Sequence, residues 1–174
     1  MTFDPRLRGG KLVFEGGAMY KHIMVPLDGS ELAECVLPHV IAIATGCETP
    51  QVTLVRVVTP LKIYGTELDG SVSPEIMAKV ESENLALARQ YLDKKVKELK
   101  AKGIETRAEV MFGNVLEALT DYAEKGKVDL IVLATHGRSG ISRWVWGSVA
   151  DRILRSAKVP VLMVRPQGCP TPGV

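Results

Sequence analysis

A glycine-rich stretch between residues 135 and 148 has the residue types that bind anions. Gly137 and Gly140 allow the backbone to approach a ligand closely and to adopt positive φ angles. Gly147 precedes Ser148, where a helix is expected to begin, and the free N–H groups and positive dipole end of a helix N-terminus favour an anion. The Ser148 hydroxyl could contact a phosphate oxygen or cap that helix, and the glycines could also serve only to shape the loop. Spacing alone therefore predicts an anion site and leaves these alternatives open.

The common nucleotide-binding motifs are absent from the chain. There is no Gly-Lys-Ser/Thr sequence of a P-loop, and no G-x-G-x-x-G fingerprint follows the first apolar run. Asp28 does follow that run, and it could either contact a ligand or form a turn before Ser30. His136 has no second histidine, cysteine pair or acid close in sequence to activate it, so we expect it to pack or to lie near a phosphate rather than to catalyse a reaction.

Apolar runs that alternate with helical patterns predict the elements that position these residues. The expected strands cover residues 22–27, 52–58, 106–111, 129–134 and 160–165. The expected helices begin near residues 30, 73, 114 and 148, and the first of them is expected to run to about residue 45. Three of the strands are almost continuous in Val, Ile and Leu, as strands buried on both faces are. The alternation predicts an α/β fold with a single doubly wound five-stranded parallel sheet and four helices. Ligands bind such sheets at the carboxyl ends of the strands, where the strand order reverses.

Cap residues mark several of the helix ends. Ser73, followed by Pro74, is expected to cap the second helix, and Asn114, with Glu117 three residues later, the third. The last helix is expected to turn four apolar residues inward: Val149, Ile153, Leu154 and Ala157.

Composition and charge exclude several classes of protein. The chain has 174 residues, with 22 basic and 20 acidic side chains spread along it. Because a dedicated nucleic-acid binder would show a basic stripe, we expect no nucleic-acid partner. The apolar runs are far shorter than the roughly 20 residues of a membrane span, so we expect no membrane association. Three scattered cysteines indicate neither a disulfide framework nor a zinc site, and they favour a cytoplasmic location.

Both ends of the chain lie outside the regular pattern. Residues 1–18 contain basic residues and glycines but no apolar stretch of a secretory signal, and we interpret them as an irregular N-terminal extension. Residues 167–174 read as an irregular tail, which leaves a single domain over residues 19–166.

Residues 19–166 resemble the universal stress protein family. Its ATP-binding branch carries the signature Gly-x2-Gly-x9-Gly-Ser/Thr, and here nine residues separate Gly137 from Gly147, with Ser148 following. Ala134 stands at the first glycine position, which is a departure from the signature. The matching segments, in order along the chain, are residues 22–31, 112–114, 147–151 and 159–164.

The resemblance implies a fold like that of the adenine nucleotide alpha hydrolases, and a role for each matching residue. It implies that Asp28 contacts the adenosine part of ATP, that the Pro26 backbone lines that end, and that Val52 meets the adenine through its main chain. The phosphates are expected to meet Gly137, Gly147, Ser148 and Val149, with His136 and Gly140 nearby and Ala134 at the strand end. Any Mg²⁺ is expected to be held mainly through the phosphates. The resemblance also implies a homodimer formed through the edge strand Val161–Val164, an apolar edge that favours pairing with another chain.

Three functions are consistent with the sequence. The first is an ATP-binding regulatory protein of the stress response, which acts as a dimer with unidentified protein partners and hydrolyses ATP slowly at most. The second is a nucleotide-free interaction scaffold with the same fold, which Ala134 favours and the Gly137-x9-Gly147-Ser148 spacing argues against. The third is an ATP-using ligase or nucleotidyltransferase, against which the Leu-Asp-Gly-Ser sequence after the first strand argues because those enzymes carry other motifs there.

Overall fold

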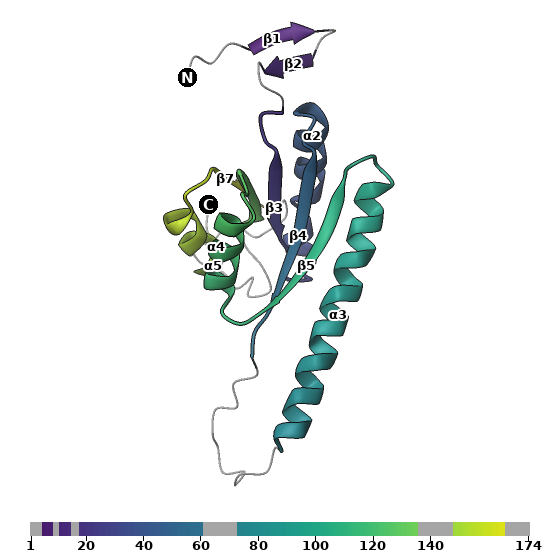
Figure 1. Ribbon diagram of the computed structural model, residues 1–174, viewed down its shortest axis with the longest axis vertical. Helices are drawn as coiled ribbons and strands as arrows, with labels where there is room; N and C mark the ends of the chain where they lie inside the picture. Colours follow the sequence, from purple (N-terminus) through teal and green to yellow (C-terminus); the bar gives the residue numbers. More distant parts are fainter. Residues whose placement is uncertain (1–4, 9–10, 15–17, 61–72, 136–147, 166–174) are drawn as a thin grey trace, which may run out of the picture.

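The main sheet has five parallel strands whose order places the first strand in the centre. The computed structural model describes residues 5–8, 11–14, 18–60, 73–135 and 148–165. The strands are β3 (His22–Pro26), β4 (Gln51–Val58), β5 (Thr106–Phe112), β6 (Leu130–Ala134) and β7 (Val161–Val164). They lie in the order β5-β4-β3-β6-β7, and every pair is parallel (Figure 1). The predicted doubly wound sheet is confirmed, and the predicted strand ends agree with the observed ones to within one residue.

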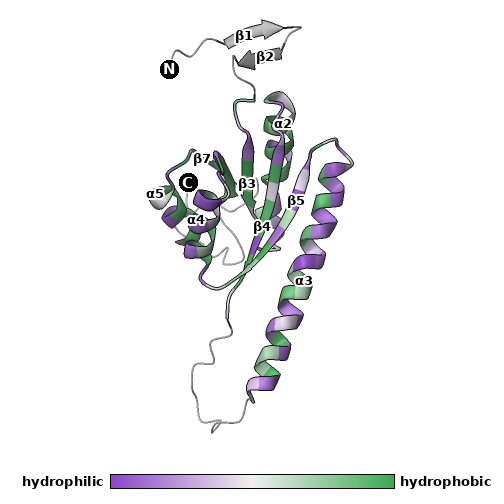
Figure 2. Cartoon of the chain, in the orientation of Figure 1, coloured by the Kyte–Doolittle hydropathy of each residue, from purple (hydrophilic) through white to green (hydrophobic). Residues whose placement is uncertain are grey.

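Helices cover both faces of this sheet. They are α1 (Glu31–Glu34), α2 (Leu37–Gly46), α3 (Pro74–Lys100), α4 (Val115–Lys125) and α5 (Ser148–Ser156). One core cluster joins the sheet to α2 and α3, and a second joins it to α4 and α5. Strand residues contribute alternately to the two clusters: Ile23 and Val25 belong to the first and Met24 to the second, each with 0% exposure. Burial on both faces explains why the middle of β3 is a continuous apolar run (Figure 2).

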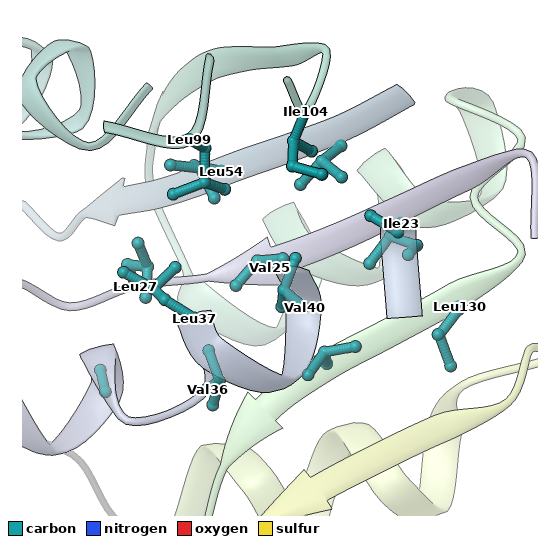
Figure 3. Close-up of a cluster of buried hydrophobic side chains, with 14 of the residues drawn as sticks. Ile23, Val25, Leu27, Val36, Leu37, Val40, Leu54, Leu99, Ile104 and Leu130 are labelled. Atoms are coloured by element: carbon teal, nitrogen blue, oxygen red, sulfur yellow. The ribbon is translucent and has the colours of Figure 1, made fainter. Parts of the chain in front are cut away.

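The first core cluster shows how the central strand is fixed. Ile23 and Val25 of β3, and Leu27 just after it, belong to one buried cluster with Val36, the residue before α2, and with Val40 in its first turn (Figure 3). Each of these side chains is at most 3% exposed. Such close packing on both faces makes β3 a rigid base for the loop that follows it.

The helix predicted over residues 30–45 is interrupted. The structure has α1 ending at Glu34 and α2 beginning at Leu37, with Pro38 in the first turn of α2. Proline lacks the N–H that would donate to the carbonyl of Glu34, and its ring clashes with that carbonyl in a continuous helix. The prediction of one helix was therefore wrong, and Pro38 is the reason.

Both predicted caps are confirmed. Ser73 accepts from the N–H of Ile76, and Asn114 accepts from the N–H groups of Leu116 and Glu117. The inward face of α5 was predicted only in part. Ile153 is buried, and Ala157, which follows the helix, is half-buried in the second cluster.

Val149 and Leu154, in contrast, are 36% and 43% exposed. The inward stripe of α5 runs instead through Ala150 and Ile153. These two residues are three apart and share one helix face.

Helix α3 is longer than the strands that it covers. At 1.5 Å per residue its 27 residues span about 40 Å, whereas the eight residues of β4 span about 26 Å. Figure 1 shows the amino-terminal half of α3 extending past the end of the sheet. Ile76 and Leu87 in that half are 55% and 60% exposed, whereas Ala88, Leu92 and Leu99 are buried.

The N-terminal extension contains local structure that the sequence pattern did not predict. Strands β1 (Pro5–Arg8) and β2 (Lys11–Phe14) pair with each other in an antiparallel hairpin. The expectation of a wholly irregular segment does not hold for these residues. In the part of the chain that the structure describes, no helix is both long and apolar enough to cross a membrane.

Candidate functional site

The strand order reverses between β3 and β6. From β3 the chain proceeds to β4 and β5 on one side, whereas β6 is followed by β7 on the other. The register pairs Met24 with Ile131, so both strands run toward the same carboxyl edge. A crevice outside the carboxyl ends at such a reversal is where open α/β sheets bind ligands. Asp28 follows β3 at this edge, and Ala134 ends β6 there.

Asp28 is held in a tight turn at the start of α1. Its Oδ1 accepts from the N–H of Ser30 at 2.9 Å and from the Ser30 hydroxyl at 2.6 Å. Ser30 Oγ in turn accepts from the N–H of Ala33 at 3.1 Å and caps α1. Gly29, between them, has a φ of +85°. The turn role that the sequence left open for Asp28 is therefore present, and it fixes a half-exposed carboxylate at the carboxyl edge.

Hydrogen bonds extend both central strands to this edge. The N–H of Leu27 donates to the carbonyl of Val55 at 2.8 Å, one residue past the half-buried Pro26. The N–H of Thr135 donates to the carbonyl of Val164 at 2.9 Å, one residue past Ala134. Pro26 and Ala134 thus lie at the ends of the two strands that flank the reversal.

The predicted phosphate residues are only partly described. His136, Gly137, Gly140 and Gly147 lie outside the described residues. The backbone of Ser148 begins α5, and Val149, the next residue, is exposed. The roles predicted for all of these residues stay predictions.

Val52 does not join the other site residues. It is the second residue of β4, it has 0% exposure, and its N–H donates to the carbonyl of Glu105 at 2.9 Å. Because the strands are parallel, the start of β4 lies at the amino edge of the sheet, opposite the strand reversal where the ligand was predicted. A main-chain contact from Val52 to that ligand therefore does not fit the structure. The half-buried Val57 is the β4 residue near the carboxyl end.

The structure brings a charged cluster to the carboxyl edge that sequence analysis missed. We call Asp28, Arg56, Tyr91, Glu34 and Lys95 the carboxyl-edge cluster. The Arg56 guanidinium lies over the Tyr91 ring, with its Cζ 5.2 Å from the ring centroid. The Tyr91 hydroxyl donates to Glu34 Oε1 at 2.9 Å, and Lys95 Nζ donates to Glu34 Oε2 at 2.7 Å. One signal was available, because Arg56 is the only charged residue in the run of residues 51–58.

Burial and neighbouring charges shift the pKa values of two residues in this cluster, Tyr91 and Lys95. Burial raises the pKa of Tyr91 well above its usual value, and the neighbouring Glu34 carboxylate raises it further. Burial would lower the pKa of Lys95, but its hydrogen bonds and attraction to Glu34 and Glu98 outweigh that effect and raise it. Tyr91 therefore stays a neutral hydrogen-bond donor and Lys95 stays a cation at physiological pH.

A second polar cluster lies at the opposite, amino edge of the sheet. We call His22, Thr53, Arg107 and Tyr122 the amino-edge cluster. His22 Nδ1 donates to the carbonyl of Gly126 at 2.9 Å, because a carbonyl oxygen can only accept. In the neutral ring the other nitrogen, Nε2, is then an acceptor, and it accepts from Thr53 Oγ1 at 2.8 Å. Arg107 donates to Thr53 Oγ1 at 3.0 Å and to the Tyr122 hydroxyl at 3.3 Å. His22 is thus a buried structural residue.

The described residues do not form a metal site. Among them, no group of three or more His, Cys, Asp or Glu side chains is placed to hold a metal ion.

Comparison with known proteins identifies relatives of this fold. The family model of the universal stress protein family matches residues 19–165. The chain is 33% identical over 155 residues to the universal stress protein MJ0531 of Methanocaldococcus jannaschii, and the alignment covers 88% of this chain and 87% of that protein.

Solved structures agree with this match. The structure of MJ0577 from the same organism superposes with a TM-score of 0.74 at 28% identity, over 86% of this chain and 99% of that chain. A universal stress protein solved in complex with cAMP superposes with a TM-score of 0.58 at 22% identity, over 86% of this chain and 98% of that chain. At that identity the second likeness is one of fold.

Proposed function

The chain belongs to the universal stress protein family, and from this premise we propose that it is an ATP-binding regulatory protein whose nucleotide lies at the carboxyl edge between β3 and β6. The observation that carries the proposal is the strand reversal, which brings Asp28 and the end of β6 to one edge. A structural neighbour in the family has been solved with an adenine nucleotide, cAMP. That complex supports nucleotide binding by this fold.

The residues at this edge suit the parts of ATP. The Asp28 carboxylate can accept hydrogen bonds from ribose hydroxyls, and the strand-end backbone at Pro26 and Ala134 can meet the adenosine part. Val57 replaces Val52 in this proposal, because it lies at the carboxyl end of β4.

Phosphate binding is proposed for the glycine-rich stretch and the helix that follows it. Gly137, Gly147, Ser148 and Val149 are proposed phosphate contacts, with His136 and Gly140 nearby, because glycines and a helix N-terminus favour anions. When bound, Mg²⁺ would be held through the phosphate oxygens.

A homodimer through β7 completes the proposal. β7 is at the end of the strand order, and Leu162 in it is 36% exposed. Val149 and Leu154 of the neighbouring α5 are also exposed. An apolar edge strand with exposed apolar residues beside it favours pairing with a second copy of the chain.

A nucleotide titration tests the proposal. Protein that has been stripped of any bound nucleotide is titrated with ATP by calorimetry, beside a Gly147→Val variant. We expect micromolar affinity for the parent, about −8 kcal/mol, and much weaker binding by the variant because the added side chain fills space needed by the phosphates. Gly46→Val is the matched control, because a Cβ at this exposed helix end would meet no atom within 4 Å other than its chain neighbours and the adjacent backbone of its own helix.

Two outcomes would contradict the proposal. A folded parent that releases no nucleotide and shows no heat with ATP would instead be an interaction scaffold. Equal loss of affinity in both glycine variants would place the effect outside the phosphate stretch.

A further inference from the structure

We propose that Arg56 is a positioning residue for the nucleotide site: its guanidinium, stacked on Tyr91, holds the Asp28–Gly29 turn in the conformation that presents the Asp28 carboxylate to the ligand. The inference rests on the proposed nucleotide binding and adds to it a residue in β4 that carries no part of the glycine signature. Three sets of contacts support it.

The first contact joins Arg56 to Gly29. A Cβ atom added at Gly29 would lie 2.9 Å from Arg56 Nη1 and 3.2 Å from its Cζ. The guanidinium therefore packs against Gly29, in space that a Cβ at this position would need. The φ of +85° at Gly29 independently favours glycine. Arg56 thus supports the turn from the face of the sheet that α3 covers.

The second contact fixes Arg56 itself. Its Cζ lies 5.2 Å from the centroid of the Tyr91 ring, within the range of a cation–π interaction. Its backbone is fixed as well, because the preceding Val55 pairs with Pro26 at the end of β3. A long side chain held by a ring and by a central strand keeps one position, as a positioning residue must.

The third set of contacts closes a ring through α1. Tyr91 donates to Glu34 of α1, and Lys95 holds the other carboxylate oxygen of Glu34. The N-cap of the same helix, Ser30, donates twice to Asp28. The turn is therefore fixed from one side by α1 and from the other by Arg56, and both supports meet at Tyr91.

This arrangement is expected to affect ligand binding as well as stability, because it orders the Asp28 carboxylate. Two hydrogen bonds from Ser30 hold Asp28 Oδ1, and the Arg56 guanidinium packs against the adjoining Gly29. The carboxylate is thus held before a ligand arrives. A site that is ordered in advance binds more tightly, because less conformational entropy is lost on binding.

A double-mutant cycle tests the inference. The stripped parent, Arg56→Met, Asp28→Asn and the double variant are titrated with ATP. We expect Arg56→Met to weaken binding about tenfold. If Arg56 acts through Asp28, it should have no further effect in the Asp28→Asn background. Arg107→Met is the matched control, because it removes an arginine of similar contacts at the amino edge, and its ATP affinity should equal that of the parent.

The outcomes separate this inference from the proposed function. A parent that does not bind ATP overturns the proposed function itself. A parent that binds, with Arg56→Met within about twofold of it or with additive effects in the double variant, overturns the positioning role alone.

A second set of variants covers the case in which Arg56→Met does not fold. Tyr91→Phe keeps the ring beneath Arg56 and removes only the hydroxyl, whereas Tyr91→Leu removes the ring. Arg56→Lys keeps the charge but loses the planar guanidinium. The inference expects Tyr91→Leu and Arg56→Lys to weaken ATP binding more than Tyr91→Phe does. Equal affinities in all three variants would overturn it.

Discussion

The two polar clusters of this sheet differ in how deeply their side chains are buried. In the amino-edge cluster each group meets another protein group: His22 meets the Gly126 carbonyl and Thr53, and Arg107 meets Thr53 and Tyr122. Thr53 and His22 are 0% and 6% exposed. The carboxyl-edge cluster instead runs from Lys95 and Glu34 to the half-exposed Asp28 turn. The difference is consistent with a structural role for the amino-edge cluster, and it leaves the charged carboxyl-edge cluster at the edge where we propose that the nucleotide binds.

Among the variants that test this difference, Thr53→Val is expected to cause the largest loss of stability. The substitution keeps the shape of the side chain and removes the hydroxyl that His22 and Arg107 share. His22 Nε2 also lies 2.9 Å from the side-chain amide of Gln51, and Arg107 keeps its bond to Tyr122. The cost is therefore that of two lost hydrogen bonds, one of them from a guanidinium, about 2 kcal/mol in the free energy of unfolding. Denaturant titration measures the loss, and calorimetry should find ATP affinity unchanged.

Thr120→Val is the control for Thr53→Val. The Thr120 hydroxyl donates only to carbonyls of its own helix, Leu116 and Glu117, so its removal should cost less. If Thr53→Val loses ATP affinity at a temperature where the variant is folded, the amino-edge cluster affects ligand binding as well as stability, and the proposed division of roles between the two clusters is wrong.

A somewhat smaller effect on stability is expected from Gly29→Ala at the carboxyl edge. The positive φ alone makes alanine unfavourable by about 1 kcal/mol, and the new Cβ must displace the Arg56 guanidinium. Unlike Thr53→Val, this variant should also bind ATP more weakly. Denaturant unfolding and calorimetry on the same sample give both quantities.

The Arg56→Met background sharpens the Gly29→Ala prediction. If displacement of the guanidinium contributes to the loss of stability, Gly29→Ala should cost less when Arg56 is already absent. An equal cost in both backgrounds would mean that only the backbone angle matters at Gly29.

The smallest effect is a pH dependence of stability at the amino edge. Burial lowers the pKa of His22 below 6.5; the Gly126 carbonyl opposes this, the Arg107 charge adds to it, and Asp129 opposes it. The unfolded chain therefore binds a proton near pH 6.5 that the folded protein takes up only at lower pH. The contribution of His22 to the free energy of unfolding should therefore be complete above about pH 6.5 and should decrease as the pH falls below that value.

Comparison of variants isolates this contribution. Unfolding of the parent and of His22→Gln is measured at several pH values below neutrality, and the parent should lose more stability than the variant. His39→Gln, at an exposed position of α2, should follow the parent. Identical pH profiles for the parent and His22→Gln would show that His22 does not titrate differently in the two states.

Much of the fold could be predicted from the sequence because its signals are local. Runs of Val, Ile and Leu gave the strands, and Ser73 and Asn114 gave two helix starts. The interruption of the first helix was also visible in Pro38, but the apolar pattern on either side outweighed it.

The candidate site was less predictable because it depends on which end of a strand lies at the carboxyl edge of the sheet. Val52 and Val57 lie in the same apolar run, and only the parallel direction of β4 places one at the amino edge and the other at the carboxyl edge. The pairing of Arg56 with Tyr91 depends on how α3 lies on β4. No local pattern encodes that arrangement, so the carboxyl-edge cluster required the structure.

The length of α3 has a consequence for amide hydrogen exchange, because the two ends of this helix should exchange at different rates. Its carboxyl-terminal half is anchored by Leu92 and Leu99, whereas its first turns extend past the sheet and carry the exposed Ile76. Helical turns without tertiary packing are marginal on their own, so these amides exchange with solvent through local fraying, while those near Leu99 exchange only when the domain opens. Because α3 runs back from the end of β4, the frayed end lies on the side of the sheet where the strands terminate. The boundary between fast and slow exchange should therefore fall within one continuous helix, close to Ala88.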